Sequence, residues 1–581
     1  MAFQVTPAHQ AIFDAIKDDN GGNLIIEAVA GAGKTSTIVE ALKLIAPEKK
    51  VVFLAFNTSI VQELKTRVPS HVDVMTLNGL GWRAYLAHAK AQGFSCKDPD
   101  TKKTLTIARD CLSTADMARI GTDACKLVSK AKASGLLPDG IEWAVQGLMP
   151  DTFESWVWLA QRFDVDCEDA LSDTINAAQA IYKRSCAVRN VLDFDDQQLL
   201  TFGLGLKMPK FDWVFVDEAQ DLSPLQHRLV ERIVNGRNGS RLVAVGDPHQ
   251  SIYGFRGADV DSMNKLERDF NCTKLPLHVS YRCAKAIVAE AQQSVSHIQA
   301  HQDAPDGTVE RNVKVLDDCS VKPGDFILCR LSAPVVQAAY SLLRAGIPAV
   351  VRGRDIGTGL LKLLDKLKSI DLGQAEARLG AWEERELAKV KDDEAKQASI
   401  QDRAETLRLF IRMSDSLDDC RSRIEKMFSN DNPEGAVICS TVHKAKGLEA
   451  DRVFLIDRDK MPHKMAKQPW QVQQEINLIY VAVTRAKKHL QFVTLSGDAA
   501  LKKPKEAGKE DPWQEIGGNT YPVKDSLKAL GCKWEPTKKV WMCPPNRADE
   551  ARKLVGGAPA KRSAPSGRST AATEACTLTR R

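Results

Sequence analysis

Several features that define other protein classes are missing from this chain of 581 residues. No apolar run reaches about 18 residues, the length that a membrane-spanning helix requires. Residues 1–20 mix acidic, polar and apolar side chains, without the basic start and apolar stretch of a secretory signal. We therefore expect no membrane as a partner and a cytoplasmic location, in the host cytoplasm if the chain is viral.

The 14 cysteines include no Cys-x-x-Cys pair, and their spacing suits neither a zinc site nor an iron–sulfur cluster. We expect reduced thiols, several of them buried in strands, as at Cys329 and Cys439. The formal net charge is only +6, so it neither requires nor excludes nucleic acid as a partner. A protein that moves along a nucleic acid needs a local basic track, which an average does not reveal.

The chain does have an ordinary globular composition, with 43% apolar and 27% charged residues. Its length predicts roughly three to five domains. Strand patterns at 23–28 and 51–56 enclose a helical pattern from about Lys34, which indicates a parallel sheet covered by helices. Helical patterns dominate 101–191, and strand patterns return at 213–216 and 241–245. A helical insertion is therefore expected to interrupt the first sheet.

A second α/β pattern begins near residue 275. Its strands are expected at 326–330, 349–352, 436–439, 452–456 and 489–494, of which the last would close the sheet. Residues 381–430 contain no Gly or Pro and many Glu, Lys, Ala and Arg residues, which predicts one or two long, solvated helices. Beyond a charged linker, residues 519–555 predict a compact strand–helix–strand piece.

Residues 28–35, AVAGAGKT, follow a predicted strand and open a predicted helix, as a phosphate-binding loop does. Small residues allow backbone amides to approach phosphates, Lys34 would reach the β- and γ-phosphates, and the Thr35 hydroxyl would bind Mg²⁺. The usual first glycine of this motif is Ala28 here. The expected nucleotide contacts of this loop are Ala30, Gly31, Ala32, Gly33, Lys34, Thr35 and Ser36.

Residues 216–221, VDEAQD, end an apolar strand with acidic side chains. Asp217 would hold Mg²⁺ directly or through water, and Glu218 would polarise the attacking water. Taken alone, these residues are also compatible with a solvated acidic turn. Together with the phosphate loop they favour ATP and Mg²⁺ as cofactors.

Further segments occur in an order that resembles the UvrD/Rep-type superfamily 1 DNA helicases. They are TPAHQ at 6–10, FLAFNTSI at 53–60, TLNG at 76–79, GDPHQSIYGFRGA at 246–258, HVSYR at 278–282, TVHKAKGLE at 441–449 and QEINLIYVAVTRA at 474–486. The resemblance covers residues 1–497. DFDD at 193–196 matches a family segment that re-enters the first domain, and we interpret it as purely structural.

The resemblance implies catalytic roles for side chains around the γ-phosphate, with Arg485 as the arginine finger. These side chains are Lys34, Asp217, Glu218, Gln250, Arg282 and Arg485. It implies that Gln10 and Tyr281 bind adenine and that Glu449 binds the ribose. Phe255 takes the place of a family aromatic, usually Trp, on which a base stacks. The residues expected at DNA are Asn57, Thr58, Thr76, Asn78 (often His in the family), Tyr253, Phe255, Thr441 and His443.

The implied fold class is α/β, with two RecA-like P-loop domains that have parallel sheets, a helical insertion in each, and a small C-terminal α/β module. The first core domain is expected at 1–90 and 193–275, with its insertion at 91–192. The second core domain is expected at 276–356 and 431–497, with its insertion at 357–430. A linker at 498–516, an accessory module at 517–555 and a disordered basic tail at 556–581 would follow.

In the accessory module, Trp534 and Trp541 either stack on bases beside Lys538 and Lys539 or form a small core, and we favour the core. The basic tail would add at most weak, salt-sensitive affinity for DNA.

The resemblance implies ATP hydrolysis coupled to 3′–5′ movement along single-stranded DNA and to unwinding at single/double-strand junctions. The second insertion is much shorter than in large relatives, where it regulates unwinding. A translocase that remodels protein–DNA complexes without processive unwinding is therefore the alternative. A helicase–nuclease subunit ranks last, because no acidic–Lys nuclease constellation follows the motor motifs. No protein partner is indicated.

Overall fold

The structure is a computed structural model that describes residues 5–18, 21–163, 165, 170–234, 240–254, 257–389, 394–429, 435–463, 466, 468–495, 514–516, 523–535, 540–543 and 547–555. The predictions for Phe255, Lys538, Lys539 and the tail from 556 lie outside these residues. The chain divides into two units, Met1–Gly497 and Asp498–Arg581. Among the described residues, no helix has both the length and the apolar character needed to cross a membrane.

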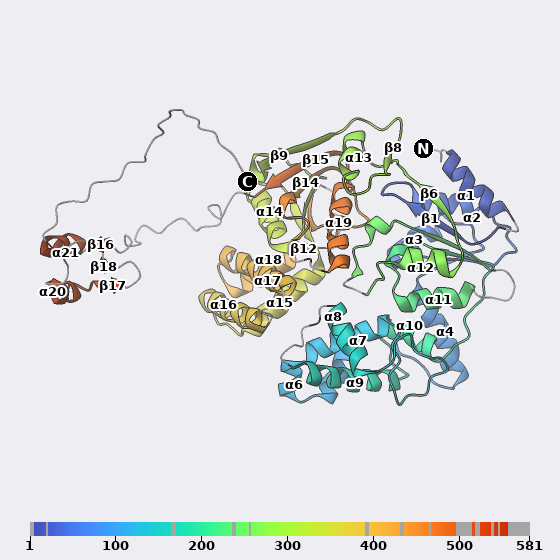
Figure 1. Cartoon of the computed structure of the whole chain (residues 1–581), viewed down its shortest axis with the longest axis horizontal. Helices are drawn as coiled ribbons and strands as arrows, with labels where there is room; N and C mark the ends of the chain where they lie inside the picture. Colours follow the sequence, from blue (N-terminus) through green and yellow to red (C-terminus); the bar gives the residue numbers. More distant parts are fainter. Residues whose placement is uncertain are drawn as a thin grey trace, which may run out of the picture. The chain divides into compact units, whose positions relative to one another are not determined.

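The first core of the larger unit is a parallel sheet with strand order β3-β2-β4-β5-β1-β6 (Figure 1). Its strands are β1 (Leu24–Ala28), β2 (Val51–Leu54), β3 (Val72–Met75), β4 (Trp213–Val216), β5 (Arg241–Gly246) and β6 (Thr273–Leu277). Alternate residues of β2 and β4 enter two different hydrophobic clusters, so both faces of the sheet are covered. Burial of both faces explains why the sequences of these strands are unbroken apolar runs. The covering helices include α1 (Pro7–Lys17), α2 (Lys34–Leu42), α3 (Thr58–Lys65), α11 (Pro224–Val234) and α12 (Ser262–Asp269).

The second core is also a parallel sheet, with strand order β12-β11-β13-β10-β14-β15-β9. Its strands are β9 (Thr308–Val315), β10 (Phe326–Cys329), β11 (Ala349–Arg352), β12 (Phe428–Ser429), β13 (Val437–Thr441), β14 (Ala450–Ile456) and β15 (Ala486–Thr494). Its helices include α13 (Lys285–Ala291), α14 (Ser332–Arg344) and α19 (Pro469–Val483). A pair of two-residue strands, β7 (Val279–Ser280) and β8 (Gln299–Ala300), precedes it. The two parallel sheets confirm the predicted α/β fold class.

The sheets differ from the predicted strands in two details. The first sheet has a strand that was not predicted, because β6 pairs with β1 as far as Leu277. The strand predicted to close the second sheet, β15, is not its edge, because β9 pairs along its outer side. All eight β9 residues are at least partly exposed, as expected for an edge strand, so the segment lacks the apolar run that marks a buried strand.

The helical segment inside the first core comprises α4 (Leu77–Ala91), α5 (Lys103–Cys111), α6 (Thr114–Arg119), α7 (Gly121–Ala133), α8 (Phe153–Arg162), α9 (Leu171–Ala187) and α10 (Phe194–Gly203). Two ammonium groups are buried among these helices. The Nζ of Lys132 lies 2.6 Å from Asp193 and 2.8 Å from Asp196, and the Nζ of Lys103 lies 2.6 Å from Asp196. Burial alone would lower the pKa of Lys132, but the two carboxylates outweigh it and raise that pKa. Asp193 and Asp196 therefore have the structural role predicted for the DFDD segment.

The second insertion is more compact than the predicted one or two solvated helices. Its described residues form four helices, α15 (Arg354–Leu367), α16 (Leu372–Lys389), α17 (Glu394–Met413) and α18 (Leu417–Met427), which lie together in Figure 1. Leu379, Trp382, Leu407 and Phe410 are buried among them. The polar composition of 381–430 reflects the outer faces of these helices, whereas the inner faces form a small core.

The smaller unit has an antiparallel sheet with strand order β16-β18-β17. Its elements are β16 (Gln514–Ile516), α20 (Lys524–Ala529), β17 (Lys533–Glu535), β18 (Val540–Cys543) and α21 (Ala548–Val555). The predicted linker thus includes a strand, and the predicted strand–helix–strand order is incomplete. Trp541 is buried, but Trp534 is 47% exposed, so the small core includes only one of the two indoles.

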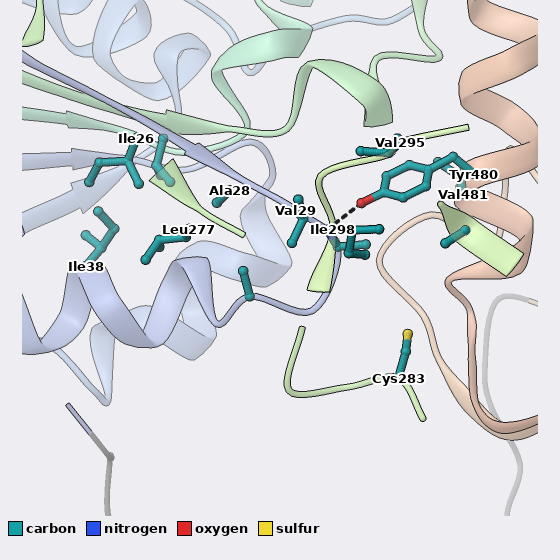
Figure 2. Close-up of a cluster of buried hydrophobic side chains, with 14 of the residues drawn as sticks. Ile26, Ala28, Val29, Ile38, Leu277, Cys283, Val295, Ile298, Tyr480 and Val481 are labelled. Carbon is teal, nitrogen blue, oxygen red and sulfur yellow. Dashed lines mark hydrogen bonds between the residues drawn. The ribbon is translucent and has the colours of Figure 1, made fainter. Parts of the chain in front are cut away.

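The two cores of the larger unit meet along a continuous hydrophobic seam (Figure 2). Ala28 and Val29 of the first core share this cluster with Val295, Ile298 and Tyr480 of the second. The Tyr480 hydroxyl accepts a hydrogen bond of 2.8 Å from the backbone N–H of Ala30. A buried side chain of α19 therefore holds the phosphate loop directly.

We expect that removing the charge of Lys132 destabilises the larger unit strongly. Lys132→Ala leaves Asp193 without its ammonium partner inside the protein, and breaking a buried pair costs about 3–5 kcal/mol. Urea unfolding should show the loss. The matched control is Lys126→Ala on the same helix, where Lys126 pairs with Asp123 at the surface, and it should change the free energy of unfolding by less than about 0.5 kcal/mol. Equal unfolding midpoints for the two variants would contradict the argument.

The Tyr480 hydroxyl at the seam gives a second stability prediction. Tyr480→Phe leaves the Ala30 amide without its acceptor and should lower the free energy of unfolding by about 1–3 kcal/mol. Tyr340→Phe, in the partly buried α14, serves as the control and should have a smaller effect. The measurement is again the shift of the urea midpoint, and a Tyr480→Phe midpoint equal to that of the unaltered chain would refute the prediction.

Candidate functional site

The loop between β1 and α2 turns sharply at two glycines. Gly31 and Gly33 have φ values of 74° and 77°, in the left-handed region that other residues rarely adopt. A Cβ on Gly31 would lie only 2.5 Å from the Cβ of Arg282, so this position also requires glycine for space. α2 begins at Lys34, which places its N-terminal amides toward the loop. The sequence AVAGAGKT thus adopts the strand–loop–helix arrangement predicted for it.

An acidic pair lies opposite this loop at the end of β4. The Nζ of Lys34 is 3.6 Å from the Oε1 of Glu218, and Asp217 accepts a hydrogen bond of 2.9 Å from the Glu218 backbone. Glu218 has a φ of 50°, a left-handed conformation that is uncommon for glutamate. Backbone strain of this kind concentrates at functional sites. The alternative of a solvated acidic turn does not hold, because Asp217 is buried.

The two carboxyl groups differ in their electrostatic surroundings. Burial would raise the pKa of Glu218, but the charges of Lys34 and Lys446 outweigh it and lower the value to about 2. Burial and the adjacent Glu218 charge raise the pKa of Asp217 to about 7. Glu218 is therefore the carboxylate that these two ammonium groups hold ionised.

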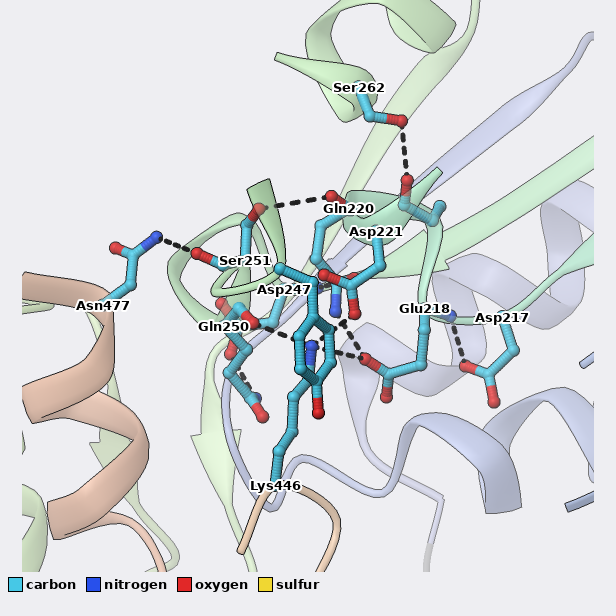
Figure 3. A network of polar contacts seen from close by, with 12 residues as sticks. Asp217, Glu218, Gln220, Asp221, Asp247, Gln250, Ser251, Ser262, Lys446 and Asn477 are labelled. Atoms are coloured by element: carbon cyan, nitrogen blue, oxygen red, sulfur yellow. Dashed lines mark hydrogen bonds and ion pairs between the residues drawn. The ribbon is translucent and has the colours of Figure 1, made fainter. Parts of the chain in front are cut away.

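The loop after β5 is fixed by a network of amide side chains (Figure 3). Gln250 donates a hydrogen bond of 2.6 Å to Asp247, whose backbone N–H donates to Gln220 at 3.0 Å. Gln220 in turn donates to Glu218. Because β4 and β5 are parallel neighbours, their carboxyl ends meet at one edge of the sheet and bring Gln250 and Glu218 into the same network.

Lys446 is a site residue that the sequence analysis missed. It lies in the loop after β13 of the second core, yet its ammonium donates to Asp221 at 2.5 Å and to the Gln250 carbonyl at 2.8 Å. It also lies 3.7 Å from Glu218 and 4.9 Å from the ring centroid of Tyr253. The motif TVHKAKGLE had identified this loop, but only the three-dimensional contact shows which of its side chains reaches the acidic pair.

The predicted arginines lie at the same junction, on the side of the second core. Arg282 forms an ion pair with Glu449, and its Nη1 donates to the Thr484 carbonyl at 3.4 Å. Arg485 is buried and donates to the carbonyls of Val481 and Leu448 at 3.0 and 2.9 Å. Burial and the nearby charge of Arg282 lower the pKa of Arg485 to about 10.

The residues predicted to bind adenine lie in the first turn of α1 and beside it. Tyr281 is 41% exposed, and its ring centroid lies 6.2 Å from that of His9 and 4.9 Å from that of His301. Gln10 is exposed and donates to Asp14 at 2.6 Å. The structure therefore places the partly exposed Tyr281 ring beside α1. Gln10 follows the buried His9 in that helix.

A cavity of about 230 Å³ lies between α10, the start of α4 and the loop after β5. Three aromatic side chains line it: Phe56 and Phe194, which are 44% and 52% exposed, and Tyr253, whose ring stacks on Phe56 at 6.0 Å. Asn78 lines it too and is held between the Phe194 carbonyl and Gln198. Phe194 belongs to the DFDD segment, for which we predicted a purely structural role, and its ring lies at this cavity.

Several other residues predicted at DNA are engaged in local structure. Asn57 caps α3 by accepting from the Ile60 amide, and Thr76 caps α4 by accepting from the Gly79 amide. Thr58 is the exposed first residue of α3, and Thr441 is the last residue of β13, where its side chain is largely buried. The carbonyl of His443 accepts a hydrogen bond of 3.2 Å from the Tyr253 hydroxyl.

Comparison with known proteins matches both halves of the larger unit. Residues 9–271 match the UvrD/REP helicase N-terminal domain, and residues 373–497 match the UvrD-like helicase C-terminal domain. The F-box DNA helicase protein 1 of Schizosaccharomyces pombe is 24% identical over 81% of this chain and 55% of that protein. The ATP-dependent DNA helicase PcrA of Staphylococcus epidermidis is 26% identical over 48% of this chain and 38% of that protein. The probable DNA helicase II homolog of Rickettsia felis is 26% identical over 48% and 43%, respectively.

The chain thus spans only about 38 to 55% of the length of these curated relatives. The two domain matches lie in the order predicted from the motifs, and they cover the phosphate loop, the acidic pair, the loop of Lys446 and the segment of Arg485. The chain belongs to the UvrD-like helicase family.

Proposed function

We propose that this chain is an ATP-driven DNA helicase that moves 3′ to 5′ along single-stranded DNA and separates strands at junctions. The observation that carries the proposal is the position of Lys446. Its ammonium lies between the ionised Glu218 of the acidic pair and the Tyr253 ring of the aromatic cavity. A change of charge beside Glu218 would therefore affect the aromatic cavity through the Lys446 side chain. The 3′–5′ direction rests on the resemblance of the motif QSIYGFRGA to one branch of the family.

Hydrolysis requires a water held beside the γ-phosphate and compensation of the charge that develops there. Glu218, kept ionised by Lys34 and Lys446, polarises the water. Lys34 and the loop amides hold the phosphates, and Arg282 and Arg485 approach from the second core. Because the two sets belong to different domains, ATP favours their closed arrangement and hydrolysis releases it.

Thr35 and Asp217 would hold Mg²⁺. A hydroxyl and a carboxylate beside the phosphate loop are the hard oxygen ligands that this ion prefers. Burial and the neighbouring Glu218 charge raise the pKa of Asp217 to about 7, and a bound cation would relieve both effects. When bound, Mg²⁺ neutralises charge on the phosphate oxygens.

The aromatic cavity suits unpaired bases. Stacking on an aromatic ring tolerates every base, which a motor that steps over all sequences needs. Phe56, Phe194 and Tyr253 provide such rings, and duplex DNA, whose bases are already stacked, would not enter a cavity of this size. The binding partner that we propose is therefore single-stranded DNA, with junctions as the place of unwinding.

The first test is ATP hydrolysis with and without single-stranded DNA. We expect DNA to stimulate turnover, and Glu218→Gln to lower it by about 10²–10⁴-fold, the usual contribution of a general base. The control is Glu231→Gln, because Glu231 lies on the surface of α11 in an ion pair with Arg228 and should leave turnover unchanged. Hydrolysis that is absent, or that ignores DNA, would contradict the motor.

The second test addresses the cavity. Phe194→Ala should weaken binding of a fluorescent oligo-dT, followed by anisotropy, by about 1–3 kcal/mol, which corresponds to roughly five- to 150-fold. Phe153→Ala removes another exposed phenylalanine, on α8, and should bind as the unaltered chain does. If both variants show the same dissociation constant, the cavity does not hold bases.

A further inference from the structure

A group of imidazoles and one carboxylate lies at the junction of the two cores, apart from the acidic pair. Glu27 is in β1, His249 is in the short 3₁₀ helix η3 (Pro248–Gln250), and His297 is in the turn between α13 and β8. One potential ligand atom of each lies within 4.8 Å of those of the other two. His278, directly after β6, has its ring centroid 4.6 Å from that of His297. We call Glu27, His249, His278 and His297 the histidine cluster.

The histidine cluster includes a buried nitrogen atom without a hydrogen-bond partner among the described residues. This atom is the Nε2 of His297. A buried polar atom of this kind costs free energy unless something binds it.

Glu27 can exchange its present partner. Its carboxylate lies 3.3 Å from the Nζ of Lys274, but the same ammonium is 3.0 Å from Glu267. Lys274 is therefore able to stay paired with Glu267 when a cation takes its place beside Glu27. The side chain of Glu27 is 22% exposed, which leaves a path for an ion from solvent.

We propose that the histidine cluster is a binding site for a divalent transition-metal ion, with Zn²⁺ as the expected occupant. Two imidazoles and a carboxylate form the ligand set of many zinc sites, and Mg²⁺ or Ca²⁺ would demand oxygen ligands instead. Tetrahedral ligand atoms around zinc are about 3.4 Å apart, so side-chain rotations are enough to close the present spacing. His278 or a water completes the coordination.

A metal in this position would join the two cores. Glu27 and His249 belong to the first core, whereas His297 follows α13, which packs on β15, β9 and α19 of the second. His249 also stands between Asp247 and Gln250 of the polar network, and its ring centroid lies 6.3 Å from that of Tyr480. Fixing these residues together opposes the relative movement that a motor cycle needs. Bound Zn²⁺ therefore acts as a brake, a consequence that rests on the proposed function, whereas binding itself does not.

The direct test is titration of the nucleotide-free full chain, stripped of metal, with Zn²⁺ alone. Equilibrium dialysis or calorimetry should show one tight site more in the unaltered chain than in His297→Gln. Glu27→Gln should weaken that site by tenfold or more. The matched control, His88→Gln on α4, removes a histidine outside the cluster and should keep the full number of sites. Equal numbers of tight sites in His297→Gln and the unaltered chain would overturn the proposal.

Because the chain has 14 cysteines, thiolate binding must be distinguished. Co²⁺ replaces Zn²⁺ and reports its ligands in the absorption spectrum. In the unaltered chain we expect the ligand-field absorption bands of tetrahedral Co²⁺, whether or not thiolate charge-transfer bands are also present. His297→Gln should lose these ligand-field bands. A spectrum of the unaltered chain that contains thiolate bands alone would equally overturn the site, even if a variant failed to fold.

The brake is tested separately. Added Zn²⁺ should lower DNA-stimulated ATP turnover of the unaltered chain at least tenfold more than that of His297→Gln, with the inhibition reversed by a chelator. If the chain hydrolysed no ATP, the motor would fail while the metal titration still decided the site. If turnover were normal and the titration showed no site, only the metal proposal would fail.

Discussion

The arrangement of the larger unit depends on one buried ammonium group that belongs to one core and is neutralised by the other. Removing a charge from water costs several kcal/mol unless partners compensate. Burial alone would lower the pKa of Lys446, but Asp221 and Glu218 outweigh it and raise the value. The reverse also holds, since burial raises the pKa of Asp221 to about 6 while the charge of Lys446 opposes this. Neither core can move away without leaving an uncompensated charge, so the contact makes the junction sensitive to any new charge placed there.

The same principle positions the aromatic cavity. Lys103 and Lys132 are buried in the first helical insertion only because Asp193 and Asp196 meet them. These carboxylates fix the start of α10, where Asp193 is the N-cap. Phe194 is the next residue, and this anchoring holds its ring at the cavity although half of it is exposed. An exposed aromatic ring on a rigid helix start loses little further entropy when a ligand stacks on it.

Features that depend on neighbouring residues could be predicted from the sequence, whereas features that depend on contacts between distant segments could not. β4 was predicted at its observed bounds because a strand covered on both faces must be a short apolar run. The phosphate loop followed equally well, since its glycines are required by backbone conformation and space. β9 was not predicted, because a mostly exposed edge strand has no such run. Lys446 and the histidine cluster are beyond any local pattern, because their partners lie in segments far apart in the chain.

The electrostatics of Arg282 and Arg485 gives a physical reason why the two cores would close around a bound anion. Burial lowers the pKa of Arg485, and the nearby charge of Arg282 lowers it further. Glu449 compensates Arg282 through an ion pair, but Arg485 relies on backbone carbonyls. A polyphosphate placed opposite Lys34 would bring the negative charge that these cations share, and charge-assisted bonds of this kind are about twice as strong as neutral ones. On the proposed function, a nucleotide between the cores would make the site more favourable than it is without one, which is the differential affinity that a ligand needs to drive a conformational change.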